Sequence, residues 1–173
     1  SPPRANAPSS SAMLSAATVW KYGNKQIVQS SSRFQERFLD SGGFGFNVYG
    51  QGYPFSPDGY LKLVDTFRPD FFATMDYPCE LQLKYVCPLA SYPPLLTGAL
   101  MNTRDKTYEP QSIWDRIDAT VEYGQYLCSK STSSSICVPV IQGWMPEHYD
   151  YCIHRLEKVM AVRPYMAVGS VCM

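Results

Sequence analysis

The sequence of 173 residues lacks any run of about 18 apolar residues, so no segment is expected to span a membrane as a helix. It also lacks an excess of charge, because 15 Lys and Arg residues balance 15 Asp and Glu residues. A protein that coats nucleic acid with its whole surface would be net positive, and that class is excluded. Hydrophobic residues make up 45% of the chain, which excludes a disordered protein and is enough for one core.

The sequence has six cysteines but no C-x-x-C pair. A disulfide scaffold would be shorter and denser in cysteine, and a zinc ribbon needs paired ligands. We therefore expect reduced cysteines and a cytoplasmic protein. His148 and Cys152 stand four positions apart and could share a metal on a helix, but no third ligand is nearby. We expect no metal site in this segment.

Acidic residues are missing from the start of the chain, where the first one is Glu36. Ser and Pro crowd the first eleven positions, which predicts a disordered or extended tail over residues 1–32. An acid-poor, Ser-rich leader is also typical of organelle transit peptides, so an organelle is the alternative location. A single domain over residues 33–173 is expected to follow.

Short apolar segments alternate with amphipathic ones between residues 33 and 173. Strands are predicted at 37–39, 71–75, 136–141 and 165–168, and helices are predicted to begin near residues 57, 112 and 146. This order is typical of a parallel α/β sheet, open or closed. Prolines at about 77–110 predict a long loop. Glycines gather at 42–52, but no Lys-Ser/Thr follows, so we expect turns there rather than a P-loop.

The predicted strands end in polar residues or glycine, at Asp40, Asp76, Gln142 and Gly169. Because the carboxyl ends of parallel strands meet on one face, we expect these residues to line one pocket. A carboxylate can accept hydrogen bonds from the ring N–H and amine of a guanine-like base, while amides donate to its carbonyl oxygen. Two nearby carboxylates could also divide acid–base and recognition work. The alternative is that these residues only terminate strands, since Asp and Gly are common in turns.

Four short motifs occur in order along the chain. They are FLDSGGF at 38–44, ATMDYPCE at 73–80, VPVIQGW at 138–144 and VGSVC at 168–172. Together they resemble the tRNA-guanine transglycosylase superfamily. The last two motifs look closest to the deazapurine DNA-modification (DNA-guanine transglycosylase-like) branch of that superfamily.

The resemblance implies a TIM-type (β/α) barrel that exchanges guanine for a 7-deazaguanine derivative in DNA or tRNA. Such a barrel takes about 250 residues, so we expect it to be incomplete in this chain. Asp40 would be the acid–base group at the leaving base, and Asp76 would read the ring N–H and amine. Gln142 and the Gly169 backbone would hold the carbonyl oxygen of the base.

The resemblance also implies that Gly143 and Ser170 shape the pocket. The family uses a further, late aspartate to attack the sugar carbon, and tRNA-acting members carry a late zinc site, but no residue up to Met173 can be assigned to either. Two alternatives remain open. One is a catalytically inactive barrel relative that serves as a binding or assembly subunit, with a protein partner completing or covering the barrel. The other, a metal-dependent barrel hydrolase, lacks a His/Asp ligand cluster.

Overall fold

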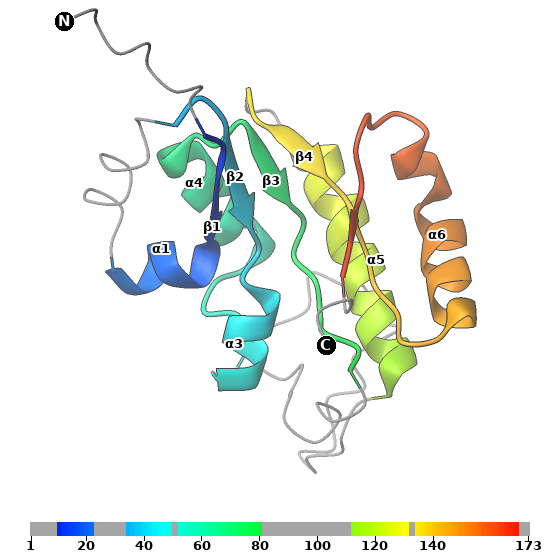
Figure 1. The fold of residues 1–173 in the computed structure, drawn as a ribbon. Coiled ribbons are helices and arrows are strands. Elements are labelled where there is room, and N and C mark those ends of the chain that lie inside the picture. The colour runs from blue at the N-terminus through cyan, green and yellow to red at the C-terminus, as the bar shows by residue number, and fades with distance from the viewer. Residues whose placement is uncertain (1–9, 23–33, 50–51, 81–111, 132–133, 170–173) are drawn as a thin grey trace, which may run out of the picture.

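Strands and helices alternate along the chain, as the sequence predicts (Figure 1). The computed structural model describes residues 10–22, 34–49, 52–80, 112–131 and 134–169. The elements in chain order are β1 (Ala12–Ser15), α1 (Ala16–Tyr22), β2 (Arg37–Asp40), α3 (Gly43–Tyr49), α4 (Pro57–Phe67), β3 (Phe71–Ala73), α5 (Ile113–Lys130), β4 (Ile136–Val138), β5 (Val140–Ile141), α6 (Pro146–Met160) and β6 (Ala167–Val168). Across these ranges, no helix combines the length and the apolar character needed to cross a bilayer.

The strands form a parallel sheet in which sequence neighbours are also spatial neighbours. β1 to β4 lie in chain order and every pair is parallel. Pro139 separates β4 from β5, and β5 pairs in parallel with β6. The predicted parallel α/β class is therefore confirmed. Each connection moves one strand in the same direction, whereas a doubly wound sheet reverses its strand order.

The core lies between the sheet and the helices behind it. The strand register aligns one row of side chains that faces α4 and α5, made of Leu14, Leu39, Phe72 and Cys137. The last three of these are fully buried. The alternating row of Met13, Phe38, Phe71 and Ile136 lies on the opposite face, because successive side chains of a strand point to opposite sides. Figure 1 shows α4 and α5 behind the strands.

The predicted helix starts are confirmed, and serine side chains cap the first two of them, α4 and α5. Ser56 precedes α4 and its Oγ accepts a hydrogen bond from Gly59 N at 3.2 Å. The helix ends at Arg68, whose left-handed backbone (φ 51°) redirects the chain. Ser112 and Asp115 cap α5 reciprocally through side-chain and backbone groups.

The predicted N-terminal tail is wrong for residues 12–22, which form β1 and α1. β1 joins the edge of the sheet, where Ala12 N donates to Glu36 O at 2.9 Å. Ser15 acts as a cap rather than as part of a disordered run, because its Oγ accepts from Ala17 N at 3.2 Å. Val19 in α1 is fully buried. Residues 1–9 and 23–33 lie outside the described part.

Two other loop predictions have different outcomes. The glycine-rich stretch forms the short helix α3, which follows a turn at Gly42 with φ 78°. Within α3 the Asn47 side chain donates to Gly43 O at 2.7 Å. Of the long loop predicted at about 77–110, residues 77–80 have no regular secondary structure and the rest lie outside the described residues.

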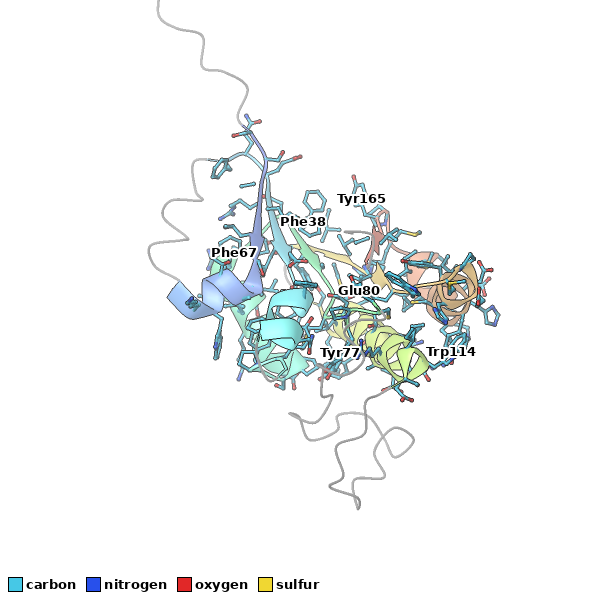
Figure 2. The ribbon with its side chains drawn as sticks, turned by 60° about the horizontal axis from the view of Figure 1, so that its bottom comes forward. Phe38, Phe67, Tyr77, Glu80, Trp114 and Tyr165 are labelled. Atoms are coloured by element: carbon cyan, nitrogen blue, oxygen red, sulfur yellow. The ribbon has the colours of Figure 1, made fainter. Side chains whose placement is uncertain are left out.

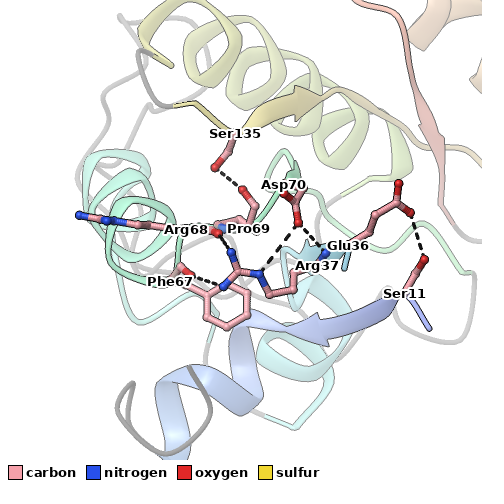
Figure 3. Close-up of polar contacts among 8 residues, drawn as sticks. All are labelled: Ser11, Glu36, Arg37, Phe67, Arg68, Pro69, Asp70 and Ser135. Atoms are coloured by element: carbon pink, nitrogen blue, oxygen red, sulfur yellow. Dashed lines mark hydrogen bonds and ion pairs between the residues drawn. The ribbon is translucent and has the colours of Figure 1, made fainter. Parts of the chain in front are cut away.

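The amino-terminal edge of the sheet is tied together by polar contacts (Figure 3). Arg37 donates from Nη2 to Arg68 O at 2.5 Å, at the end of α4, where a cation is favoured. Arg37 N also donates to Asp70 Oδ2 at 2.8 Å. Ser135, just before β4, donates to Pro69 O. These contacts hold the starts of β2, β3 and β4 together, at the edge of the sheet opposite the carboxyl ends of the strands.

Candidate functional site

Asp76 joins three segments at the carboxyl edge of the sheet, which lies at the bottom of Figure 1 and comes forward in Figure 2. Its Oδ1 accepts a hydrogen bond from Ser41, which follows β2. Its Oδ2 accepts one from Nε2 of Gln142, which follows β5 and is 2% exposed. Side chains from positions 41, 76 and 142 therefore meet in one buried polar cluster.

Asp40 ends β2 beside this cluster. Its Oδ2 accepts a hydrogen bond from Gly42 N at 2.9 Å, and the Ser15 hydroxyl also binds the carboxylate. Its charge acts on Asp76 strongly enough to raise the pKa of that group. In the described part of the chain, neither carboxylate forms an ion pair with Lys or Arg. The two acids thus lie at the same edge of the sheet, and no described Lys or Arg side chain holds either of them in a structural salt bridge.

Tyr53 is a member of the site that sequence reasoning missed. Its hydroxyl is buried and lies 3.0 Å from Ser41 Oγ and 2.9 Å from Asp76 O, and it accepts from Asp76 N at 3.0 Å. A side chain on Gly43 would come within 2.6 Å of Asp76 O and 2.9 Å of the Tyr53 hydroxyl. No motif marks Tyr53, which lies between a glycine-rich stretch and α4. Its role is visible only once the backbone of Asp76 is placed beside it.

Burial makes both carboxylates weaker acids than usual. The pKa of Asp76 is raised to about 6, first because burial removes water from the charged form and then because Asp40 is close. The hydrogen bonds from Ser41 and Gln142 oppose this rise. Burial also raises the pKa of Asp40, against the hydrogen bonds that it accepts. Two acids that change protonation nearer to neutral pH can exchange protons with a substrate.

Gly169 has a different role from the one predicted for its backbone. Its N–H donates to Ile141 O at 2.9 Å as part of the β5–β6 pairing, and its carbonyl accepts from the Tyr149 hydroxyl at 3.0 Å. The N–H is therefore engaged in the sheet and does not offer a donor to a base carbonyl. A side chain here would come within 2.5 Å of Gln142 Cδ and 2.8 Å of its Oε1. Glycine at this position gives Gln142 its space.

The loop after β5 holds Gln142 from its backbone. Gln142 N lies 3.4 Å from Cys152 Sγ on α6. A side chain at Gly143 would come within 2.9 Å of the Tyr149 ring, so the loop packs closely on α6. Ser170, also predicted in the pocket, lies outside the described residues. The candidate site thus consists of Asp40 and Asp76 with Gln142, while Gly169 packs against the carboxamide and Gly143 packs against α6.

His148 and Cys152 both interact with backbone N–H groups of the loop that follows β5. His148 Nδ1 accepts hydrogen bonds from Trp144 N at 3.2 Å and Met145 N at 3.1 Å, which caps the start of α6. Among the residues that the structure describes, no three His, Cys, Asp or Glu side chains are placed to hold a metal ion.

Comparisons with known proteins add no family to this picture. No protein-family model matches the sequence, and a search of curated proteins finds no significant match. The interpretation of the site therefore depends on its own chemistry and on the motifs that contain its residues.

Proposed function

We propose that this protein is a base-exchange transglycosylase that replaces guanine with a 7-deazaguanine derivative in DNA or tRNA. The observation that carries the proposal is the hydrogen-bonded pair of Asp76 and Gln142 beside Asp40. Guanine presents a ring N–H, an amine and a carbonyl oxygen along one edge. A carboxylate next to a carboxamide offers the complementary acceptors and donor.

Base binding would exchange one hydrogen bond for several. Gln142 Nε2 now donates to Asp76 Oδ2. When a base enters, the carboxamide turns to the base carbonyl and leaves Asp76 to accept the ring N–H and one amine hydrogen. The bond between Ser41 and Oδ1 and the Tyr53 contacts keep the Asp76 backbone and side chain in place during this exchange.

Asp40 is proposed to move the proton. The departing base gains a proton as its bond to the sugar breaks, and the incoming base loses one in the reverse step. A carboxyl group whose pKa is raised by burial can donate a proton nearer to neutral pH. We assign no residue of this chain to the attack on the sugar carbon.

A TIM-type barrel is the architecture that we propose for this protein. The sequential, parallel strand order supports it. The sheet face away from the helices is apolar and open: Met13 is 73% exposed and Tyr165 is 54% exposed. Figure 2 shows Phe38 and Tyr165 on the side of the sheet away from α5. In a closed barrel this face is the interior, which side chains from further strands fill.

The same open face favours a second candidate function. A catalytically inactive barrel relative could bind a partner chain there and act as an assembly subunit. Apolar surface of this kind is typical of interfaces. The two candidates differ in whether the site residues are needed for any chemistry.

Base exchange tests both candidates. The protein is incubated with guanine-containing DNA or tRNA and a labelled 7-deazaguanine base. We expect incorporation that falls by about 10²-fold or more in Asp40→Asn and Asp76→Asn. Asp65→Asn, on the exposed side of α4, is the matched control and should keep full incorporation. Unchanged incorporation in either site variant removes that residue from the mechanism. No incorporation by the wild type, with stable co-purification of a partner, favours the assembly subunit.

A further inference from the structure

Glu80 is a buried acid that the site described so far does not use. It is 6% exposed, and its Oε2 is buried without a hydrogen-bond partner in the described part of the chain. Buried polar atoms are almost always paired, because leaving one unpaired sacrifices its hydration without compensation. An acceptor of this kind therefore points to a donor that the described residues do not supply.

The backbone around Glu80 is anchored. Tyr77 N donates to Thr120 Oγ1 at 2.9 Å, and Arg116 Nη1 donates to Pro78 O at 2.9 Å, so two side chains of α5 hold the segment that leads to Glu80. Thr120 and Arg116 are both fully buried. The position of Glu80 is thus built into the fold rather than left to a surface loop.

Glu80 lies beside the proposed base site. It follows Asp76 by four residues, and its charge raises the pKa of both Asp76 and Tyr149. Tyr149 is the residue whose hydroxyl binds Gly169 O. Figure 2, in which the carboxyl edge of the sheet comes forward, shows Glu80 near the middle of that edge. Glu80 therefore lies close enough to Asp76 and to Tyr149 for its charge to act on both.

Guanine has one more donor than Asp76 can accept. Its exocyclic amine carries two N–H bonds, and a carboxylate that binds the ring N–H and the amine together uses only one of them. The other points away from that carboxylate and needs an acceptor of its own in a site closed to water. Oxygen Oε2 of Glu80 lies in the same region and accepts no hydrogen bond from any of the residues that the structure describes.

We propose that Glu80 is a second base-binding carboxylate, which accepts the remaining N–H of the exocyclic amine and so selects 2-amino bases over bases without that amine. This inference rests on the proposed function, because it takes the ligand to be a guanine-type base. It adds to that function the residue that sets the preference for an amine at the 2-position of the base. A site built to accept an N–H discriminates strongly against an analogue that lacks it, since the acceptor is then left unpaired.

Equilibrium dialysis of the full chain with radiolabelled guanine and hypoxanthine tests the inference, because hypoxanthine lacks only the amine. We expect the wild type to bind guanine at least tenfold more tightly than hypoxanthine. Glu80→Met keeps the length of the side chain and removes the acceptor, so it should lower guanine affinity about tenfold and leave hypoxanthine affinity within twofold. Glu80→Gln keeps a neutral acceptor oxygen and should recover part of the loss.

Glu147→Gln, on the exposed first turn of α6, is the matched control and should change neither affinity. Thermal melting of each variant establishes that it is folded before its affinities are compared. Guanine and hypoxanthine affinities that fall together in Glu80→Met would overturn a role at the amine, as would guanine binding that is unchanged. A wild type that binds neither base overturns the base site itself, so failure of the inference and failure of the proposed function give different results.

Discussion

The carboxamide of Gln142 donates to the carboxylate of Asp76, although the two residues are 66 positions apart in the chain. The contact joins the segments that follow β3 and β5. Gln142 is held in turn by Cys152 at its backbone and by the space that Gly169 leaves for its side chain. The geometry of the candidate site therefore depends on residues that would touch no substrate.

Gly169→Ala should disrupt the site through Gln142. The added methyl group would overlap the carboxamide, whose Oε1 would lie 2.8 Å away. We expect a loss of about 1–3 kcal/mol in the free energy of unfolding and a loss of base binding, measured by urea denaturation and equilibrium dialysis. Gly45→Ala is the control: its nearest neighbour would be Ala17 Cβ at 3.4 Å, and alanine favours the helix. Full base binding by Gly169→Ala would contradict this account of Gln142.

Tyr53→Phe should destabilise the fold and loosen Asp76. It removes the hydroxyl that accepts from Asp76 N at 3.0 Å and lies 2.9 Å from Asp76 O, in a buried position. The unpaired backbone groups should lower the free energy of unfolding by about 1–3 kcal/mol. Tyr126→Phe removes an exposed hydroxyl that donates to Asp58 Oδ1 at 2.7 Å, and we expect little change there. Equal urea midpoints for the two variants would show that the Tyr53 hydroxyl does not contribute to the free energy of unfolding.

The elements that could be predicted from the sequence are those with strong local signals. The helix at Pro57–Phe67 has a capping serine, a proline in the first turn and an apolar stripe, and all three act locally. Asp40, Asp76 and Gln142 could be placed on one edge because parallel strands end on the same side.

The features that the sequence could not predict depend on distant contacts. β1 is only four residues long, and its pairing with β2 outweighs the serine-rich composition around it. Tyr53 gains its role from the backbone of Asp76, 23 positions away. The Gly169 amide was expected at the base but pairs with Ile141, a choice fixed by the register of β6.

Cys128 and Cys137 should form a disulfide under mild oxidation. Their Sγ atoms lie 2.9 Å apart between α5 and β4. The hydrogen bond between the two thiols lowers the pKa of Cys128, and Arg163 acts in the same direction, so Cys128 is the better nucleophile. Diamide, a thiol oxidant, would take up the two hydrogens as the S–S bond forms. Closing this short loop should raise the free energy of unfolding by roughly 2–3 kcal/mol.

Peptide mapping by mass spectrometry identifies the bond. Cys128→Ser should abolish both the cross-link and the stabilisation, while Cys79→Ser should leave them intact. A cross-link that persists in Cys128→Ser would assign the oxidation to other cysteines.

Asp76 should give stability and base binding opposite dependences on pH. Its pKa is raised from 3.8 to about 6 in the folded protein, so the folded state holds its proton more tightly than the unfolded state. The stabilisation from this proton is complete below the lower value and is lost as pH rises through about 6. Asp76→Asn should remove this component, which we expect to be about 1–3 kcal/mol. Urea denaturation of wild type and variant across this range measures the difference.

Binding of guanine should weaken as pH falls through about 6, because a protonated Asp76 cannot accept both the ring N–H and the amine. Asp40 also has a raised pKa and adds to the stability change in the same direction. Asp40→Asn therefore separates the contribution of Asp40 to the pH dependence of stability from that of Asp76. The exposed Asp65→Asn should leave the pH dependences of stability and of guanine affinity unchanged. If stability and guanine affinity of the wild type rise together with pH, the buried proton does not belong to Asp76. Guanine affinity that does not change with pH would instead show that the two oxygens of Asp76 are structural acceptors for Ser41 and Gln142 and that the base is read elsewhere.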